Sequence, residues 1–232
     1  MKFQCYASGS TGNLYTASND STTIMIECGI TYNKINNLLD YTLHSVDSCL
    51  VSHYHQDHCK AYKEIAKAGI DVYMSEETKE ALGATGHRIH TITPKIQFRV
   101  KDFTILPFET EHVEGSLGFV IKCELTKEKL LFITDSFYCR YKFKNLTQLA
   151  VECNYSEELL KQNITDGITD KARLKSIQRS HFSLEHIKDF LLANDLTKVT
   201  QIYLLHLSSS NANANFIKEE VQKATGKEII IC

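Results

Sequence analysis

The chain has 232 residues, with 26 basic and 28 acidic side chains, a formal net charge of −2 and 43% hydrophobic residues. This balance is ordinary for a globular protein of one large or two small domains. The charge argues against a protein that grips long nucleic acid through its phosphates, although a local basic groove is compatible with it. No run of eighteen apolar residues occurs, which argues against a membrane-spanning helix.

The cysteines and the N-terminus bear on the compartment. The opening residues MKFQCYASGS do not resemble a signal peptide. The eight cysteines form no C-x-x-C pair, and the chain is too long to require a disulfide framework. We therefore expect reduced thiols in a soluble cytoplasmic protein.

Short segments rich in Val, Ile, Phe and Tyr predict β-strands. In chain order they cover residues 3–5, 14–17, 23–27, 49–52, 72–74, 96–100, 103–108, 117–123, 130–134, 149–151, 201–205 and 228–231. Lys101 and Asp102 separate two of these strands and predict a hairpin turn.

Apolar residues spaced by about 3.6 predict helices. They cover residues 33–39, 61–68, 76–82, 156–161, 184–192 and 215–225, and Ser183 is placed to cap the fifth of these. The mixture of strands and helices predicts two sheets with helices packed outside, in a single domain over residues 1–232. The charged segment 164–180 has no clear apolar stripe and fits a lid, a dimer arm or a solvated surface helix.

Three histidines and an aspartate fall within six residues of the segment CLVSHYHQDHCK. His53, His55, Asp57 and His58 follow the apolar end of a predicted strand, where a loop can gather ligands at a sheet edge. Imidazole nitrogen and carboxylate oxygen suit zinc, and also manganese or iron. The cluster predicts a metal site with room for a second ion, and a solvated histidine-rich loop is the alternative.

Four ligands are too few for two metal sites, so more are expected later in the chain. His112, Asp135 and His206 follow the apolar segments ILPFETE, LLFIT and QIYLL. Each lies at the end of a predicted strand, so all three can reach the same edge. Each alone also fits a hydrogen-bonded strand end.

The H-x-H-x-D-H cluster, the later lone histidine, the aspartate after a strand and the final histidine resemble the metallo-β-lactamase superfamily. The resemblance covers nearly the whole chain and implies a four-layered αβ/βα sandwich, an α/β fold with metals at one edge of its two sheets. It implies two Zn²⁺ ions, with Mn²⁺ as an alternative. The implied ligands are His53, His55 and His112 for the first metal, Asp57, His58 and His206 for the second, and Asp135 as the bridge.

Finer motifs resemble the YycJ-like and ribonuclease Z-like members. SGSTGN at residues 8–13 resembles the YycJ opening, and Glu27-Cys28 stands where Asp-Ala is usual. In the family that aspartate orients a ligand histidine, so the longer side chain of Glu27 alters the contact that supports this histidine. ECNY, SHFS and LLHLS resemble three later motifs, in which the middle histidine binds or protonates the scissile phosphate. His181 and Ser183 are the matching substrate-binding residues, and Asp57, Asp135 and His181 the matching catalytic ones.

The chain lacks the long arm and large insertions of the tRNA- and RNA-processing members. What remains resembles YycJ-like hydrolases and the small phage anti-Pycsar phosphodiesterases. The resemblance therefore implies a two-zinc phosphodiesterase that hydrolyses cyclic nucleotide monophosphates to linear nucleotides. It also implies a homodimer and a role in evading a host Pycsar defence. If the protein is phage-encoded, the resemblance implies that it acts in the host cytoplasm. The alternative is a YycJ-like exonuclease acting on DNA or RNA. A lactonase or thioesterase fits SHFS less well.

Overall fold

Most of the predicted strands and helices form close to their predicted ends in the computed structural model, which describes residues 1–232. The chain divides into two compact units. Unit 1 comprises residues 1–109 and 113–128, and unit 2 comprises residues 110–112 and 129–232. The single-domain interpretation stays a prediction.

Unit 1 contains a six-stranded sheet in which the strands follow their sequence order. The first three strands pair antiparallel and the others parallel. They are β1 (Lys2–Ala7), β2 (Leu14–Ser18), β3 (Thr23–Ile26), β4 (Ser48–Leu50), β5 (Asp71–Met74) and β6 (Ile89–Thr91).

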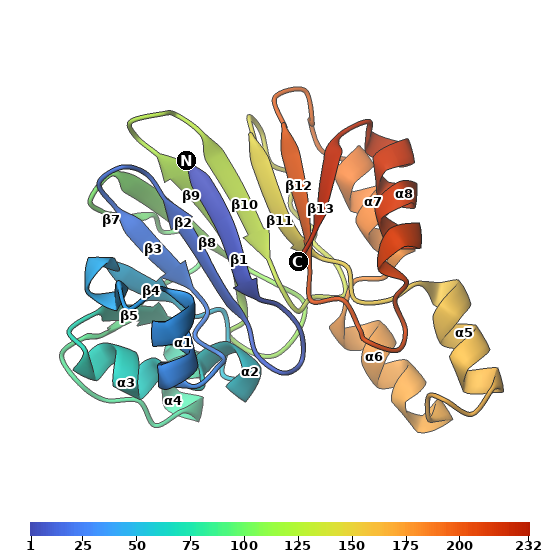
Figure 1. Cartoon of the computed structure of the whole chain (residues 1–232), viewed down its shortest axis with the longest axis horizontal. Coiled ribbons are helices and arrows are strands. Elements are labelled where there is room, and N and C mark those ends of the chain that lie inside the picture. The colour runs from blue at the N-terminus through green and yellow to red at the C-terminus, as the bar shows by residue number, and fades with distance from the viewer. The chain divides into compact units, whose positions relative to one another are not determined.

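Helices α1 (Tyr32–Leu38), α3 (Tyr62–Lys67) and α4 (Glu76–Ala81) lie beside this sheet (Figure 1). Ile35 of α1 and Ile65 of α3 join Met25, Cys49 and Val72 of the strands in one buried core. Burial of such side chains stabilises a fold by about 1.5–3 kcal/mol each. This core therefore supports the loop that follows β4.

Unit 1 also contains the antiparallel strands β7 (Phe98–Val100), β8 (Phe103–Glu109) and β9 (Leu117–Cys123). Val100 pairs with Phe103, which confirms the predicted turn at Lys101 and Asp102.

Unit 2 has four parallel strands, namely β10 (Lys129–Ile133), β11 (Gln148–Glu152), β12 (Gln201–Leu205) and β13 (Glu228–Ile231). Helices α7 (Leu184–Leu192) and α8 (Ala214–Thr225) lie side by side (Figure 1). The Ser183 hydroxyl accepts the His186 N–H at 3.1 Å, which confirms the predicted helix cap. Parallel strands end at one edge, so residues after β10 and β12 can meet there.

Strand β6 and three short turns, one of them a 3₁₀ turn at Leu43–Ser45, were absent from the sequence prediction. Strand β6 pairs parallel with β5 at the edge of the sheet, and α2 (Gln56–Cys59) is a single turn. Segment 164–180, for which a solvated surface helix was one of the alternatives, forms the end of α5 (Glu157–Thr165), a 3₁₀ turn at Lys171–Arg173 and α6 (Leu174–Ser180). A single turn and a polar helix show no apolar period, so pattern alone does not reveal them. No helix is both long and apolar enough to cross a membrane.

Candidate metal centre

The loop after β4 gathers four of the predicted ligands in unit 1. His53 Nε2 lies 3.0 Å from His55 Nδ1, and the His53 and His58 rings are 4.2 Å apart. His58 Nε2 lies 3.4 Å from Asp57 Oδ2. The side chains meet because α2 begins directly after His55 and turns Asp57 and His58 back beside the first two histidines. The loop thus presents imidazole nitrogens and a carboxylate together.

Buried polar residues of unit 1 orient this loop. Glu27 is fully buried, and its Oε2 lies 3.6 Å from His58 Nδ1. Burial raises the pKa of Glu27, against the opposing effect of His58. Glu27, one carbon longer than the usual aspartate, therefore still lies next to His58 Nδ1. On the other side of the ring, Asn13 Nδ2 lies 3.3 Å from His58 Nε2.

Gly29 lies directly beneath the ligand loop. A Cβ placed on Gly29 would come within 1.6 Å of the Asp57 carbonyl oxygen and 2.7 Å of the His58 nitrogen. The Asn13 N–H and Nδ2 both donate to that same carbonyl, at 2.8 and 3.1 Å. The SGSTGN and ECG segments noted in the sequence thus hold the loop through its backbone.

A second cluster lies at the ends of β10 and β12 in unit 2. His206 Nδ1 lies 3.1 Å from Asp135 Oδ1, and His112 Nε2 lies 3.7 Å from Asp135 Oδ2. All three side chains are nearly buried, with 3–5% exposed. The strand-end residues predicted to converge therefore do so within this unit.

The backbone of this cluster departs from ordinary geometry. Asp135 and His206 have φ values of 33° and 54°, in the left-handed region that non-glycine residues rarely adopt. Such conformations cost of the order of 1–3 kcal/mol each and concentrate at functional sites. The strain is consistent with strand ends shaped to aim two side chains rather than to maximise stability.

Glu152 connects two histidines of the second cluster. It ends β11 and is fully buried, and its Oε1 lies 2.6 Å from His181 Nδ1 and 3.1 Å from His206 Nδ1. Ligand atoms of Asp135, Glu152, His181 and His206 all lie within 4.8 Å of one another. His181 is therefore part of the cluster, and its role toward a substrate stays a prediction.

The charges of Glu152 and His181 depend on each other. Burial lowers the pKa of His181, but the Glu152 carboxylate outweighs it and the net effect raises that pKa. Burial raises the pKa of Glu152, but the neighbouring His181 outweighs burial, so that the pKa of Glu152 is lowered overall. The pair therefore favours an ionised Glu152 and a protonated His181. The protonated imidazole is a proton donor that the carboxylate holds in a fixed position.

The sequence reasoning missed three supporting residues. Glu152, Asn13 and Asn154 were noted only inside motifs, and the structure shows that Asn154 Nδ2 donates to the His206 carbonyl at 2.8 Å. An acidic residue ending an apolar strand was the available signal for Glu152. Ser183 is fully buried with its hydroxyl in the helix cap, and its substrate-binding role stays a prediction.

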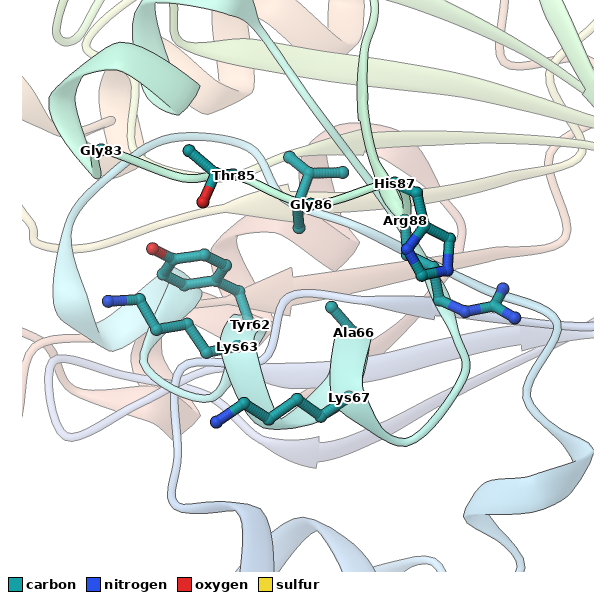
Figure 2. A pocket seen from close by; sticks show the side chains of 10 residues that line it. Tyr62, Lys63, Ala66, Lys67, Gly83, Thr85, Gly86, His87 and Arg88 are labelled. Carbon is teal, nitrogen blue, oxygen red and sulfur yellow. The ribbon is translucent and has the colours of Figure 1, made fainter.

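A cavity of about 350 Å³ lies elsewhere in unit 1, between α3 and the loop before β6. Figure 2 shows Tyr62, Lys63 and Lys67 on one side and Thr85 to Arg88 on the other. None of the candidate metal ligands lines it. We therefore do not assign catalysis to this cavity.

Curated relatives match most of the chain. The exodeoxyribonuclease WalJ of Streptococcus pneumoniae is 24% identical over 226 residues, covering 91% of this chain and 83% of that protein. The exodeoxyribonuclease YycJ of Bacillus anthracis is 26% identical over 227 residues, covering 91% and 84%. These matches confirm the resemblance to YycJ-like proteins.

Solved structures show the same fold. The metallo-β-lactamase fold protein YhfI of Bacillus subtilis has a TM-score of 0.73 at 14% identity, covering 99% of this chain and 95% of that one. The short form of human tRNase Z has a TM-score of 0.64 at 12% identity, covering 100% and 96%. They confirm the predicted αβ/βα class. Residues 22–207 match the family described as the β-lactamase superfamily domain, so this chain belongs to that superfamily of metal-dependent hydrolases.

Proposed function

We propose that the protein is a two-metal phosphodiesterase. In this proposal His53, His55 and His112 bind the first ion, Asp57, His58 and His206 bind the second, and Asp135 bridges them. The support is that each unit brings its own share of these side chains together. Membership of the superfamily supports the joint use of both shares.

The residues present fit divalent ions. The donors are imidazole nitrogens and carboxylate oxygens, which zinc and manganese accept. In unit 2 the Asp135 and Glu152 carboxylates are both buried, and Asp135 opposes ionisation of Glu152. Two neighbouring buried carboxylates require cationic partners. Bound ions would lower the pKa of water to about 7 and supply a nucleophile at neutral pH.

The observation that carries the proposal is the contact between Glu152 and His181. Glu152 Oε1 fixes His181 Nδ1 at 2.6 Å, which leaves Nε2 to donate a proton. When an alkyl phosphodiester is hydrolysed, the leaving group is a basic alkoxide. That oxygen needs a proton as its bond to phosphorus breaks. His181 is proposed as this acid, with Asp57 and Asp135 as the catalytic carboxylates that hold the ions.

Two substrate classes follow from different observations. Cyclic nucleotide monophosphates are the proposed substrates, in keeping with the short core without large insertions and the resemblance to anti-Pycsar enzymes. A role against a cyclic-nucleotide defence would follow from that activity. DNA ends are the second candidate, favoured by the two exodeoxyribonucleases that match 91% of the chain.

A substrate panel tests the proposed function. It contains cyclic CMP, UMP, AMP and GMP, bis-nitrophenyl phosphate, single-stranded DNA and an acyl lactone, each with and without a chelator. Chelator-sensitive hydrolysis of any phosphodiester supports the proposal, and the preferred one identifies the class. Hydrolysis of the lactone alone contradicts it.

Two ions per chain are expected, with zinc as the proposed metal and manganese as the alternative. Seven candidate ligands suffice for two sites, because catalytic zinc takes about three protein ligands. Elemental analysis of active protein measures the ratio, and activity restored to stripped protein by zinc or manganese identifies the metal. Fewer than one ion per active chain would contradict the two-metal proposal.

We further propose a homodimer whose partner helps to close the pocket around a small substrate. Ile168 is 65% exposed, and Leu174 and Ile177 on α6 are half-buried. Glutamate substitutions at these three positions are expected to weaken pairing by more than about tenfold, because buried charge opposes association. Light scattering measures the mass against 26.4 kDa for one chain. An active wild-type monomer at assay concentration would rule out the shared pocket.

A further inference from the structure

Two short segments of unit 2 concentrate the positive charge of the chain. Residues 136–144 read SFYCRYKFK and hold three basic side chains, and residues 171–179 read KARLKSIQR and hold four. Neither segment contains an acidic residue, although the chain as a whole has 28 acidic and 26 basic side chains. The near-neutral total therefore conceals a local basic region.

The first segment, and the chain just beyond the second, contact the same buried carboxylate. Glu152 Oε2 accepts the backbone N–H of Ser136 at 2.9 Å and that of Phe182 at 3.3 Å. Ser136 begins the first segment directly after Asp135, and the second segment ends at Arg179, two residues before His181. The basic segments thus leave the cluster from neighbouring points within unit 2.

Most of these cations have no partner within the protein. Arg140 pairs with Glu111. The remaining basic side chains are exposed and form no ion pair: Lys142, Lys144, Lys171, Arg173, Lys175 and Arg179. Unpaired exposed cations attract phosphates, and each phosphate that they neutralise releases counterions.

The arrangement on α6 separates charge from apolar surface. Lys175 and Arg179 are four residues apart and therefore lie on one side of the helix. Leu174 and Ile177 lie on the other side and are half-buried. The cations therefore lie on the more exposed side of the helix.

Aromatic residues alternate with cations in the first segment. The Tyr138 ring is 51% exposed, and the Ser136 hydroxyl donates to the Tyr138 carbonyl at 2.7 Å, which fixes the backbone there. The half-buried rings of Tyr141 and Phe143 follow, 6.5 Å apart. Exposed aromatic rings beside cations are the combination that binds single-stranded nucleic acid, through stacking and phosphate contacts.

We propose that residues 136–144 and 171–179 form a strand-binding surface, which holds a single polynucleotide strand while its end is hydrolysed at the candidate metal centre. Tyr138 stacks on a base near the scissile bond, and Lys142, Lys175 and Arg179 bind phosphates further along. The inference rests on the proposed phosphodiesterase function and develops its second candidate substrate, the end of a DNA strand, in place of a cyclic nucleotide.

The charge arm of the test uses the triple variant Lys142→Gln, Lys175→Gln and Arg179→Gln. Binding of a fluorescent phosphorothioate strand, which resists cleavage, is measured on metal-loaded protein from 50 to 200 mM salt. Loss of three phosphate contacts is expected to reduce the slope of log affinity against log salt by about 2. The KM for a cleavable strand should rise far more than the KM for bis-nitrophenyl phosphate.

A matched control removes the same charge elsewhere. Lys2→Gln, Lys34→Gln and Lys218→Gln change three exposed lysines outside the surface that form no ion pairs, and this variant should bind the strand as the wild type does. Equal salt slopes in both variants would overturn the inference. A wild type that hydrolyses small phosphodiesters but binds no strand would overturn it while leaving the phosphodiesterase intact. A wild type that binds the strand but hydrolyses no phosphodiester would refute the function instead.

The aromatic arm distinguishes stacking from charge. Tyr138→Ala is expected to weaken strand binding by about fivefold to a hundredfold, and Tyr138→Phe should retain binding because the ring remains. Tyr41→Ala is the control, since Tyr41 is 69% exposed in unit 1. Full affinity in Tyr138→Ala would exclude the stacking contact.

Discussion

Asp135→Ala is expected to reduce phosphodiester hydrolysis by at least about a thousandfold, about 4 kcal/mol of transition-state stabilisation. Asp135 Oδ1 and Oδ2 reach His206 and His112, so the substitution removes the carboxylate that connects two candidate ligands. His58→Ala should have a comparable effect, because His58 is fully buried between Asp57 and Glu27. Steady-state rates with saturating metal measure both losses.

Controls separate lost chemistry from lost folding. Asp135→Asn keeps the shape of the side chain and suits the left-handed backbone at φ 33° better than alanine does. It should retain native circular dichroism and bind less metal. Asp166→Ala and His44→Ala change exposed residues of the same types and should retain full activity. Wild-type turnover in Asp135→Asn or His58→Ala would refute the ligand assignment.

The candidate metal ligands could be picked out of the sequence because their signals are local. The segment 53–58 holds three histidines and an aspartate, which is a far higher density of histidine than an even distribution along the chain would give. Asp135 and His206 each end an apolar strand, and parallel strands bring such ends together. Strand period and residue chemistry were therefore sufficient for these positions.

The supporting contacts could not be predicted because they depend on residues far apart in sequence. Asn13 reaches the Asp57 carbonyl and Gly29 lies beneath the same peptide, and no spacing rule connects them. The short helix α2 is a single turn without a measurable period. Segment 164–180 lacked an apolar stripe, so the sequence left a lid, a dimer arm and a surface helix open, and the bounds of α6 came from the structure.

Glu152 could be predicted only in part. Its position at the end of an apolar strand was visible, but a buried carboxylate has several uses, including salt bridges and metal binding. Only the distances to His181 and His206 show that it orients two histidines at once. The same geometry links the predicted acid to the predicted ligands and leads to a kinetic prediction for His181.

His181→Ala is expected to slow hydrolysis of a diester with an alkoxide leaving group by about 10²- to 10³-fold. The loss on bis-nitrophenyl phosphate should be less than about tenfold, because nitrophenolate departs without a proton. The ratio of kcat values for the two substrates is the measurement. Its change reports proton donation, since a residue that only holds the fold or binds phosphate would affect both substrates alike.

Two further variants sharpen this test. Glu152→Gln keeps a hydrogen-bonding side chain beside His181 Nδ1 but removes the charge that raises the histidine pKa, so it should shift the same ratio by a smaller factor. His186→Ala, a half-buried histidine in the next helix, should leave the ratio unchanged. Equal losses on both substrates in His181→Ala would show that another group protonates the leaving oxygen and that His181 binds the phosphate or holds the fold.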